Sequence, residues 1–468
     1  MKKNRNKEFT VITFAFLALF VALIAYFCFF MIVQSEEFIN NPYNARISAL
    51  SDSVKRGNIL SADEVVLATT EVDENGNETR VYPYDNVFAH AVGYDSNGKA
   101  GVELLANFPM LRSHASVLIR LINDLQDNKN PGDSVVTTLD VSLQMTAYSA
   151  MGNNNGAIIA MDPATGKILT MISKPDFDPN HIAENWDAIS SNANSSVLLN
   201  RTTQGLYPPG STFKIVTALE YLNEGGKDED PYDCNGSFIS DGFEIHCYKN
   251  TAHGQETFKD GFANSCNVVF AQAGLTLDLK DYHSLCEQLL FNRTLPGEVP
   301  NLKKSSFTMD EDASDSLIMQ TAIGQGDTLV TPYHMALIAS AVCNDGLLME
   351  PYMVDRIENN EGRVVKETLP KEYGSILSSV QAENLQRYMR YVVTDGTASA
   401  LDTESYTAYG KTGTAEYNAN KNDTHAWFVG YAASGEKEIA LAIVLEGAGS
   451  GSGAAVPVAK QMLDDYFK

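Results

Sequence analysis

The chain is organised around eight residues, Tyr207-Pro208-Pro209-Gly210-Ser211-Thr212-Phe213-Lys214. Two prolines and a glycine end any preceding element, and apolar residues then recur at helical spacing as far as Gly225-Gly226. We therefore predict a helix that begins at Ser211. Residues three apart are neighbours on a helix, so the Lys214 amine should lie within reach of the Ser211 hydroxyl.

This pairing makes Ser211 a candidate nucleophile and Lys214 its candidate base. A serine hydroxyl is a poor nucleophile until a base takes its proton. A lysine with an ordinary pKa of ~10.4 is protonated at neutral pH, so burial or a second cation must lower that pKa to roughly 7 to 8. Free N–H groups in the first turn of the helix would favour an oxyanion beside Ser211. Ser96 and Lys99 share the same spacing without a following helix, so spacing alone does not identify the site.

The N-terminus carries a predicted membrane helix. Four Lys and Arg residues within the first seven positions precede the uncharged stretch Phe9–Val33. At ~1.5 Å per residue this stretch can cross a ~30 Å hydrocarbon core. No small-residue cleavage site follows it, so we interpret it as an uncleaved anchor. The positive-inside rule, with Glu36-Glu37 after the helix, places residues 1–8 in the cytoplasm and the remaining chain outside.

Composition restricts the class of partner. The chain has 468 residues, of which 44% are apolar, as in a globular protein. Its 34 basic and 59 acidic residues give a net charge of -25, which argues against nucleic acid and anionic membrane surfaces as partners. We therefore expect a soluble exported body attached to the membrane by one helix.

Six cysteines are too few for a disulfide framework, and Cys28 lies within the membrane helix. Cys234 and Cys247 bracket a short loop rich in Gly, Ser and Asp, which makes them candidates for a loop-closing disulfide, with free thiols as the alternative. Zinc held by these cysteines with His246 and His253 is a third interpretation. The spacing disfavours it because it fits no common zinc finger, so we expect no metal.

The sequence after the anchor divides into two predicted domains. Residues 34–154 show mixed structure without strong periodicity and are interpreted as a pedestal, whereas residues 155–468 have the pattern of a folded α/β core. Short connections predict an antiparallel sheet, and the flanking helices predict that it is sandwiched between helical layers, an α+β fold. Strands are predicted at 157–161, 168–172, 409–415, 427–431 and 439–445, and helices at 268–277, 333–342, 380–393 and before Lys468.

Two further motifs complete a candidate acyl-transfer site, Ser265-Cys266-Asn267 and Lys411-Thr412-Gly413-Thr414. On a regular helix Ser265 and Asn267 would point roughly 200° apart, so they converge only if a turn lies there. Ser190-Ser191-Asn192 matches the first motif equally well. Lys411 on an edge strand suits a substrate carboxylate, and its charge would lower the pKa of Lys214. Gly413 would leave room for a ligand backbone.

These three motifs, in this order, resemble those of the penicillin-recognising serine transferases. The flanking sequence narrows the resemblance to class B penicillin-binding proteins, and it extends into the pedestal at Arg56-Gly57 and Gly101-Val102-Glu103. No room precedes residue 156 for a glycosyltransferase domain, which argues against the bifunctional class A type. The flanking matches are Gly156–Pro163, Phe177–Asn180, Asn200-Arg201, Gly205–Lys214, Gly324-Gln325-Gly326, Thr331-Pro332 and Lys411–Glu416.

The resemblance implies a D,D-transpeptidase with a serine acyl-enzyme. Ser211 would attack a D-Ala-D-Ala stem peptide, Lys214 would accept its proton, and Ser265 would pass the proton to the departing D-alanine. Asn267 would bind the substrate amide. Lys411, Thr412 and Thr414, with Gly413 beside them, would bind the terminal carboxylate, and the backbone N–H groups of Ser211 and Thr414 would form the oxyanion hole.

The same resemblance implies that penicillin acylates Ser211 and that the chemistry needs no metal or organic cofactor. It also implies a membrane partner, a polytopic glycan polymerase. Hydrolysis of the acyl-enzyme, as in a D,D-carboxypeptidase or a β-lactamase, is the nearest alternative, and a non-catalytic cell-wall scaffold is another. The sequence does not distinguish elongation, division and sporulation, or name the acceptor amine.

Overall fold

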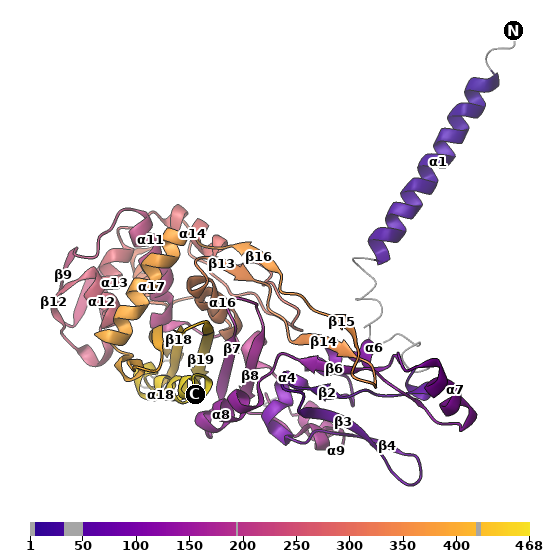
Figure 1. The fold of residues 1–468 in the computed structure, drawn as a ribbon. Helices are drawn as coiled ribbons and strands as arrows, with labels where there is room; N and C mark the ends of the chain where they lie inside the picture. The colour runs from indigo at the N-terminus through magenta and orange to yellow at the C-terminus, as the bar shows by residue number, and fades with distance from the viewer. Residues whose placement is uncertain (1–4, 32–49, 193–194, 418–422) are drawn as a thin grey trace.

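The computed structural model describes residues 5–31, 50–192, 195–417 and 423–468 (Figure 1). Helix α1 (Arg5–Phe29) stands apart from the folded body, with its described side chains exposed. Its segment Lys7–Phe29 is long and apolar enough to cross a membrane. This agrees with the predicted span Phe9–Val33, although the last two residues of that span and Glu36-Glu37 lie outside the described residues.

The larger part of the body is built on a five-stranded antiparallel sheet with the strand order β17-β18-β19-β7-β8. Nearly every residue of the central strands is buried, as expected for strands that are covered on both faces. β17 lies at an edge of this sheet. The strands are β7 (Gly156–Met161), β8 (Ile168–Lys174), β17 (Thr407–Glu416), β18 (Thr424–Ser434) and β19 (Lys437–Leu445).

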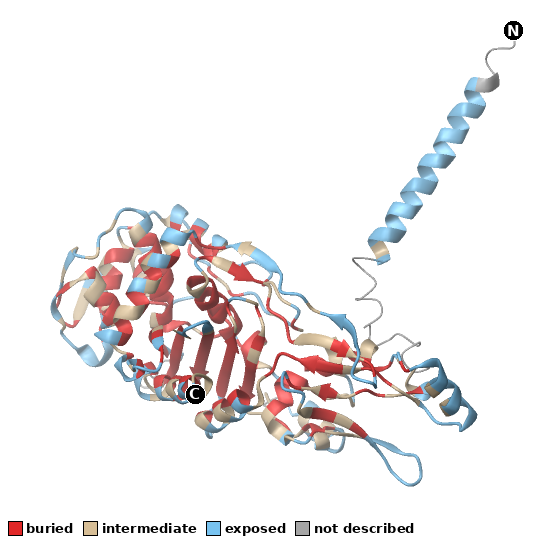
Figure 2. Ribbon diagram, viewed as in Figure 1, coloured by how far each residue is buried: buried red, intermediate tan, exposed pale blue. Residues whose placement is uncertain are grey.

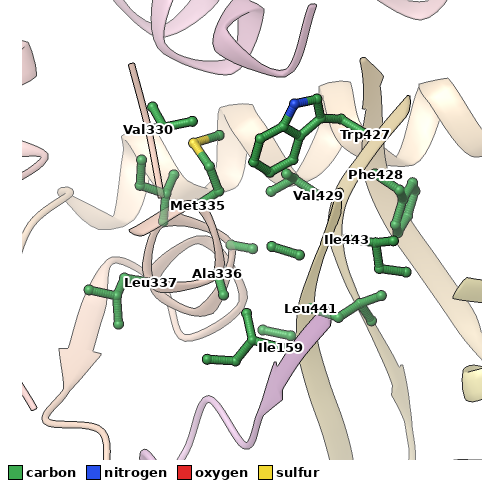
Figure 3. Close-up of a cluster of buried hydrophobic side chains, with 14 of the residues drawn as sticks. Ile159, Val330, Met335, Ala336, Leu337, Trp427, Phe428, Val429, Leu441 and Ile443 are labelled. Carbon is green, nitrogen blue, oxygen red and sulfur yellow. The ribbon is translucent and has the colours of Figure 1, made fainter. Parts of the chain in front are cut away.

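Helices cover this sheet. Helix α16 (Pro332–Cys343) packs against β7, β18 and β19, whereas α8 (Val141–Met151) and α18 (Val456–Tyr466) pack against each other and against β8 and β18. Figure 3 shows apolar side chains of α16, including Met335 and Ala336, gathered beside the strands. Figure 2 shows buried residues concentrated in the sheet and these helices. The sandwich predicted from the sequence is confirmed.

The predicted secondary structure of this part agrees with the structure. The hairpin at 157–172 is β7 paired with β8. The three internal helices correspond to α13 (Asn267–Gly274), α16 and α17 (Ser379–Thr394). The C-terminal helix ends at Tyr466, two residues before the predicted end.

The pedestal is built on a second sheet of six strands, in the order β15-β14-β6-β2-β3-β4. The parallel pairing of β2 with β6 is an exception to the otherwise antiparallel arrangement. Four strands come from the predicted pedestal region: β2 (Ile59–Leu60), β3 (Val66–Val72), β4 (Glu78–Val81) and β6 (Ser134–Thr137). The other two are β14 (Val354–Glu358) and β15 (Val364–Glu367).

Elements on each side of the predicted boundary at residue 154 therefore pack with the domain on the other side. The β14–β15 hairpin lies two hundred residues beyond that boundary, yet β14 pairs with β6 of the pedestal. Helix α8 lies before the boundary, yet it packs on α18 and β8 of the larger part. The two domains share chain in both directions, which a linear division of the sequence does not capture.

A buried ion-pair network fixes the pedestal around Glu103. Its carboxylate is fully buried in helix α5 (Gly101–Leu105) and accepts hydrogen bonds from Arg56 Nε at 2.8 Å and from Arg80 Nε at 2.7 Å. Arg56 also donates to Asn107 Oδ1 at 2.7 Å. Because the charges are paired and hydrogen-bonded, they can be buried together. The network joins α5 to the start of the sheet and to β4.

Candidate active site

Ser211 lies in a single 3-10 turn, η4 (Gly210–Phe213), and helix α11 (Lys214–Asn223) begins after it. The predicted helix is present, but its α-helical part starts at Lys214 and not at Ser211. Gly210 adopts a left-handed φ of 53°, which a glycine tolerates without strain. The buried Phe213 ring packs against Tyr282, Phe291 and Phe307 and holds the turn against the helical core.

Hydrogen bonds attach the residues before Ser211 to distant parts of the chain. Tyr207 exchanges two backbone hydrogen bonds with Val330, of 2.9 and 2.8 Å. Gly210 N donates to Gly324 O at 2.8 Å. Trp427 Nε1 donates to Pro208 O at 3.1 Å. The position of Ser211 is therefore fixed from both the sheet and the helical side.

The Ser211 turn packs directly on edge strand β17 at Gly413. A Cβ atom at Gly413 would lie 2.9 Å from Thr212 Cγ2 and 3.1 Å from Pro209 O. The space beside this glycine is thus filled by the chain itself. A side chain at Gly413 would therefore collide with the Ser211 turn, and the expectation that this glycine leaves room for a ligand backbone stays a prediction.

The Lys214 ammonium group points to the Ser265–Asn267 motif. Its Nζ donates hydrogen bonds to Ser265 O at 2.7 Å and to Asn267 Oδ1 at 2.8 Å, with Ser265 Oγ at 3.4 Å. Among the described residues, none forms a hydrogen bond with the Ser211 hydroxyl. Ser211 is partly exposed, whereas Lys214 is fully buried.

A sharp turn brings Ser265 and Asn267 together, as the sequence required. Ser265 lies between helix α12 (Phe258–Ala263) and α13 and has a φ of 59°, in the left-handed region. Cys266 is the N-cap of α13, and Asn267 is its first residue. Asn267 Nδ2 donates to His246 O at 2.8 Å, so both ends of its amide are engaged. Non-glycine residues rarely adopt this φ, and such strain is concentrated at functional sites.

Lys411, on strand β17, contacts Ser265 from the side of the sheet. Its Nζ donates to Ser265 Oγ at 2.9 Å and to Thr412 O at 3.1 Å, and the side chain is fully buried. Two buried lysines therefore meet at one hydroxyl. The ammonium group of Lys411 already has internal hydrogen-bond partners, and its expected role in binding a substrate carboxylate stays a prediction.

Burial lowers the pKa of both lysines. The pKa of Lys214 falls to about 8, with opposing contributions from Cys266, Cys247 and Glu256. Burial and then the charge of Lys214 lower the pKa of Lys411 well below its ordinary value. The shift required of Lys214 is thus present, but its main cause is loss of solvent and not the second cation.

The two threonines of the β17 motif differ in their surroundings. The Thr412 hydroxyl is buried and lies 2.6 Å from the hydroxyl of Thr397. Thr414 is half-buried, and its Oγ1 accepts a hydrogen bond from Gly451 N at 3.4 Å, which leaves its O–H as a donor. Thr397 was not identified from the sequence, because nothing in its flanking residues distinguishes it.

A cluster of metal-binding donors lies directly behind the Ser265 turn. Cys234, Cys247, Cys266 and His253 have their ligand atoms within 4.8 Å of one another. All cysteines of the described residues are free, and the Sγ atoms of Cys234 and Cys247 are 3.6 Å apart. His246, one of the four residues in the sequence-based zinc interpretation, lies outside the cluster and beside Glu244. Cys266 takes its place, a ligand that the sequence concealed within the Ser265–Asn267 motif.

Comparison with known proteins places this geometry in context. Residues 156–464 match the penicillin binding protein transpeptidase domain, and residues 56–135 match the penicillin binding protein A dimerisation domain. The peptidoglycan D,D-transpeptidase PbpA of Mycolicibacterium smegmatis is 26% identical over 97% of this chain and 98% of its own length.

Two solved structures are similar in fold. The D,D-transpeptidase domain of a peptidoglycan glycosyltransferase from Eggerthella lenta is 28% identical, with a TM-score of 0.78, over 88% of this chain and 97% of that one. Penicillin-binding protein A from Mycobacterium tuberculosis, as an imipenem acyl-enzyme complex, is 24% identical, with a TM-score of 0.80, over 90% of this chain and all of that one.

Proposed function

The chain belongs to the penicillin-binding protein transpeptidase family, and on this premise we propose that it is a class B peptidoglycan D,D-transpeptidase with Ser211 as its nucleophile. The observation that carries the assignment of residues is that two buried lysines meet at Ser265 Oγ and that one of them, Lys214, lies one turn after Ser211. A serine, a base with a lowered pKa and a second hydroxyl for proton transfer are the groups that acyl transfer needs.

In the first half-reaction Ser211 Oγ attacks the carbonyl carbon of the peptide bond that joins two D-alanines. Neutral Lys214, whose pKa is about 8, accepts the hydroxyl proton. The new Ser211 O–C bond forms as the C–N bond breaks, and the departing D-alanine takes a proton through Ser265 Oγ. Backbone N–H groups of Ser211 and Thr414 stabilise the oxyanion, which is typically worth ~3 to 4 kcal/mol per donor.

In the second half-reaction an amine of a neighbouring stem peptide attacks the acyl-enzyme. A C–N bond forms, the ester bond to Ser211 breaks, and the serine regains a proton from the amine. Asn267 orients Lys214, because its side-chain oxygen accepts a hydrogen bond from Lys214 Nζ. Its Nδ2 donates one hydrogen to His246 O, and the second is left to donate to the substrate amide. The products are a peptide cross-link and the free enzyme.

The substrate carboxylate is bound mainly by the hydroxyl groups of β17. Thr414 offers a donor at the partly exposed end of the motif, and Thr412 lies behind it. Lys411 contributes its charge from within the protein, through Ser265 Oγ and Thr412 O. Penicillin carries a carboxylate at a matching position and acylates the same serine.

The catalytic domain acts outside the cytoplasm and is held by α1. The cations before this helix support that orientation by the positive-inside rule. Residues 1–8 form a short cytoplasmic tail. The membrane partner is a polytopic glycan polymerase, which supplies the glycan strands. It contacts α1 and the pedestal.

Intact-mass spectrometry of the full chain in detergent, with and without penicillin, tests the assignment. We expect a covalent adduct that persists for hours and maps to Ser211. Loss of the adduct within seconds, with consumption of penicillin, would favour the β-lactamase or carboxypeptidase alternative. Absence of any adduct would favour the non-catalytic scaffold.

The Ser211→Ala variant identifies the nucleophile. It should abolish labelling with little change in the free energy of unfolding, because the Ser211 hydroxyl is partly exposed and has no hydrogen bond with a described residue. Ser434→Ala, the serine of a pair with the same spacing to a lysine, is the matched control and should label normally. Labelling that survives in Ser211→Ala would disprove the assignment.

A further inference from the structure

Four soft metal ligands converge on one point from separate parts of the chain. Cys234 ends strand β9 (Pro231–Cys234), and Cys247 follows β11 (Phe243–His246). His253 precedes β12 (Gly254–Thr257), and Cys266 caps helix α13. All three cysteines are buried and His253 is half-buried. Ligands from four element ends can meet only in the folded state.

Three of the six distances within the cluster match those of a tetrahedral metal site, and all six are within 4.8 Å. The sulfur of Cys247 is 3.6 Å from that of Cys234 and 3.7 Å from that of Cys266. Cys234 Sγ is 3.4 Å from His253 Nδ1. Zinc–sulfur bonds of about 2.3 Å at tetrahedral angles place two sulfurs about 3.8 Å apart, and a sulfur and a nitrogen slightly closer. A disulfide needs sulfurs about 2.05 Å apart.

The short strands that carry these residues contribute few buried side chains of their own. It contains two separate two-stranded sheets, β9 with β12 and β10 (Ser237–Ser240) with β11. Most residues of these short strands are exposed or half-buried. Isolated two-stranded hairpins are marginally stable, and small elements with few core residues commonly depend on a metal or a disulfide.

We propose that Cys234, Cys247, His253 and Cys266 form a structural zinc site that holds the Ser265–Asn267 turn in place. The donor set is three thiolates and one imidazole, a combination typical of closed tetrahedral zinc sites without an open position. Binding releases the thiol protons to solvent and couples the metal to the folding of residues 231–266. His253 binds through Nδ1, the nitrogen that faces Cys234.

The metal is one residue away from groups that touch Lys214. Cys266 lies between Ser265, whose carbonyl oxygen accepts from Lys214 Nζ, and Asn267, whose amide oxygen does the same. Asn267 also donates to the carbonyl oxygen of His246, the residue before ligand Cys247. Zinc therefore ties the strand end at 246–247 to the turn that presents Ser265 Oγ to both lysines. The cysteines and His253 act here as positioning residues, through the turn.

A disulfide between Cys234 and Cys247 is the competing arrangement. It would consume two of the four ligands and leave Cys266 as a buried thiol beside His253. A metal ion can bind all three clustered cysteines, whereas a disulfide pairs two of them and leaves the third as a free thiol. The two arrangements exclude each other, so zinc content and free-thiol content should rise and fall together, and disulfide content should vary in the opposite direction.

The test begins with the full chain in detergent, purified without added metal. Inductively coupled plasma mass spectrometry should find about one zinc per chain, and intact mass after denaturation should show all cysteines reduced. Cobalt exchanged into the site should give the absorption of a tetrahedral thiolate complex. A zinc-free protein that does not take up added zinc, or a Cys234–Cys247 disulfide in the isolated protein, would overturn the proposal.

Two histidine variants form a matched pair. His253→Ala should lose the zinc, whereas His246→Ala, which is adjacent in sequence to Cys247 but lies outside the cluster, should retain it. Zinc that remains bound to His253→Ala with wild-type affinity, or is lost equally from both variants, would contradict the ligand assignment. If a variant fails to fold, the zinc stoichiometry of the wild-type chain still decides whether the site binds zinc.

The link to the active site rests on the proposed function and is measured separately. Removal of zinc by a chelator should slow acylation by penicillin by up to about 100-fold, the effect of misplacing a reacting group by about 1 Å. Readdition of zinc should restore the rate. An unchanged rate would overturn the positioning role. Failure of the zinc-loaded protein to acylate Ser211 would instead contradict the proposed function and leave the zinc measurement standing.

Discussion

Gly324 approaches the carbonyl oxygen of Gly210 so closely that a Cβ atom on Gly324 would lie 1.9 Å from it. The same two residues are joined by the hydrogen bond from Gly210 N to Gly324 O. This contact fixes the backbone immediately before Ser211 against the end of helix α15 (Asp315–Ala322). Ser211, the proposed nucleophile, is therefore positioned by a contact that only glycine permits.

Gly324→Ala should displace the Ser211 turn. We expect a loss of roughly 1–3 kcal/mol in the free energy of unfolding and a larger relative loss in the rate of penicillin acylation. Gly326→Ala is the control, because Gly326 has nearly the same φ, 74° against 76°, but its Cβ would meet only side-chain atoms, the nearest being Leu317 Cδ1 at 3.3 Å. Thermal unfolding and acylation rates of the two variants separate the clash from backbone strain. Equal acylation rates would contradict the positioning role of Gly324.

The acylation rate should depend on pH through Lys214. Only the neutral amine accepts a proton, and its pKa is about 8, so the rate should rise about tenfold per pH unit below 8 and level off above it. Stopped-flow measurement with penicillin between pH 6 and 10, corrected for the uncatalysed reaction, checks this. Lys214→Ala should be slow at every pH. A rate that is constant from pH 6 to 9 would exclude Lys214 as the titrating base.

Thr414→Val should weaken recognition of the substrate carboxylate. A hydrogen bond to a charged group is worth roughly 1.5–3 kcal/mol, so the acylation rate should fall about 10- to 100-fold for penicillin but little for its methyl ester. The ratio of the two rates measures recognition independently of the chemical step. Thr407→Val, at the exposed start of β17, is the control and should preserve the wild-type ratio. An unchanged ratio in Thr414→Val would assign the carboxylate to other groups.

Glu103→Gln should destabilise the pedestal strongly. Arg56 and Arg80 would lose the negative charge that they share, at a cost of roughly 3–5 kcal/mol for a broken buried pair. Denaturant unfolding measures the loss. Glu78→Gln breaks a more exposed pair with Lys129 and should cost less than about 1 kcal/mol. Similar losses in both variants would show that the buried network contributes no more than a surface pair.

The same carboxylate gives the pedestal a defined dependence on pH. Burial raises the pKa of Glu103, but the charges of Arg56 and Arg80 outweigh it, so the pKa lies below 4.5. The stabilisation should therefore be complete above pH 4.5 and be lost as the pH falls through the lower folded-state pKa. In the Glu103→Gln variant the free energy of unfolding should lack this dependence on pH.

Much of the fold could be predicted because its elements are encoded locally. The buried strands β7, β18 and β19 appear as apolar runs, and α16 and α17 have apolar residues at helical spacing. The hairpin β14–β15 could not be assigned to the pedestal in this way. Its pairing with β6 is non-local, and β15 is exposed along its whole length, so no apolar pattern marks its partner.

The candidate site shows the same division. Short motifs marked Ser211, Lys214, Ser265 and Lys411 as candidates. The contacts of Lys214 and Lys411 with Ser265 follow from tertiary packing that no motif describes. The sequence predicts that Gly413 leaves space for a ligand backbone. It does not predict that the Ser211 turn packs against this glycine, because a glycine gives no indication of which atoms approach it. Cys266 lies within the Ser265–Asn267 motif, but the motif does not mark it as a metal ligand. The other three metal-binding residues are distant in sequence and meet Cys266 only when α13 is in place.

The shared sheet of the pedestal also sets the order in which this protein can be completed. Ribosomes produce β2, β3, β4 and β6 early, but β6 lacks its neighbour β14 until residue 358 has been synthesised. Between the synthesis of residue 137 and that of residue 358 the growing pedestal therefore exposes an unpaired strand edge, the kind of surface on which chains associate wrongly. A nascent chain of this length would need a chaperone or rapid completion, and truncation before residue 354 would remove support from the domain that was made first.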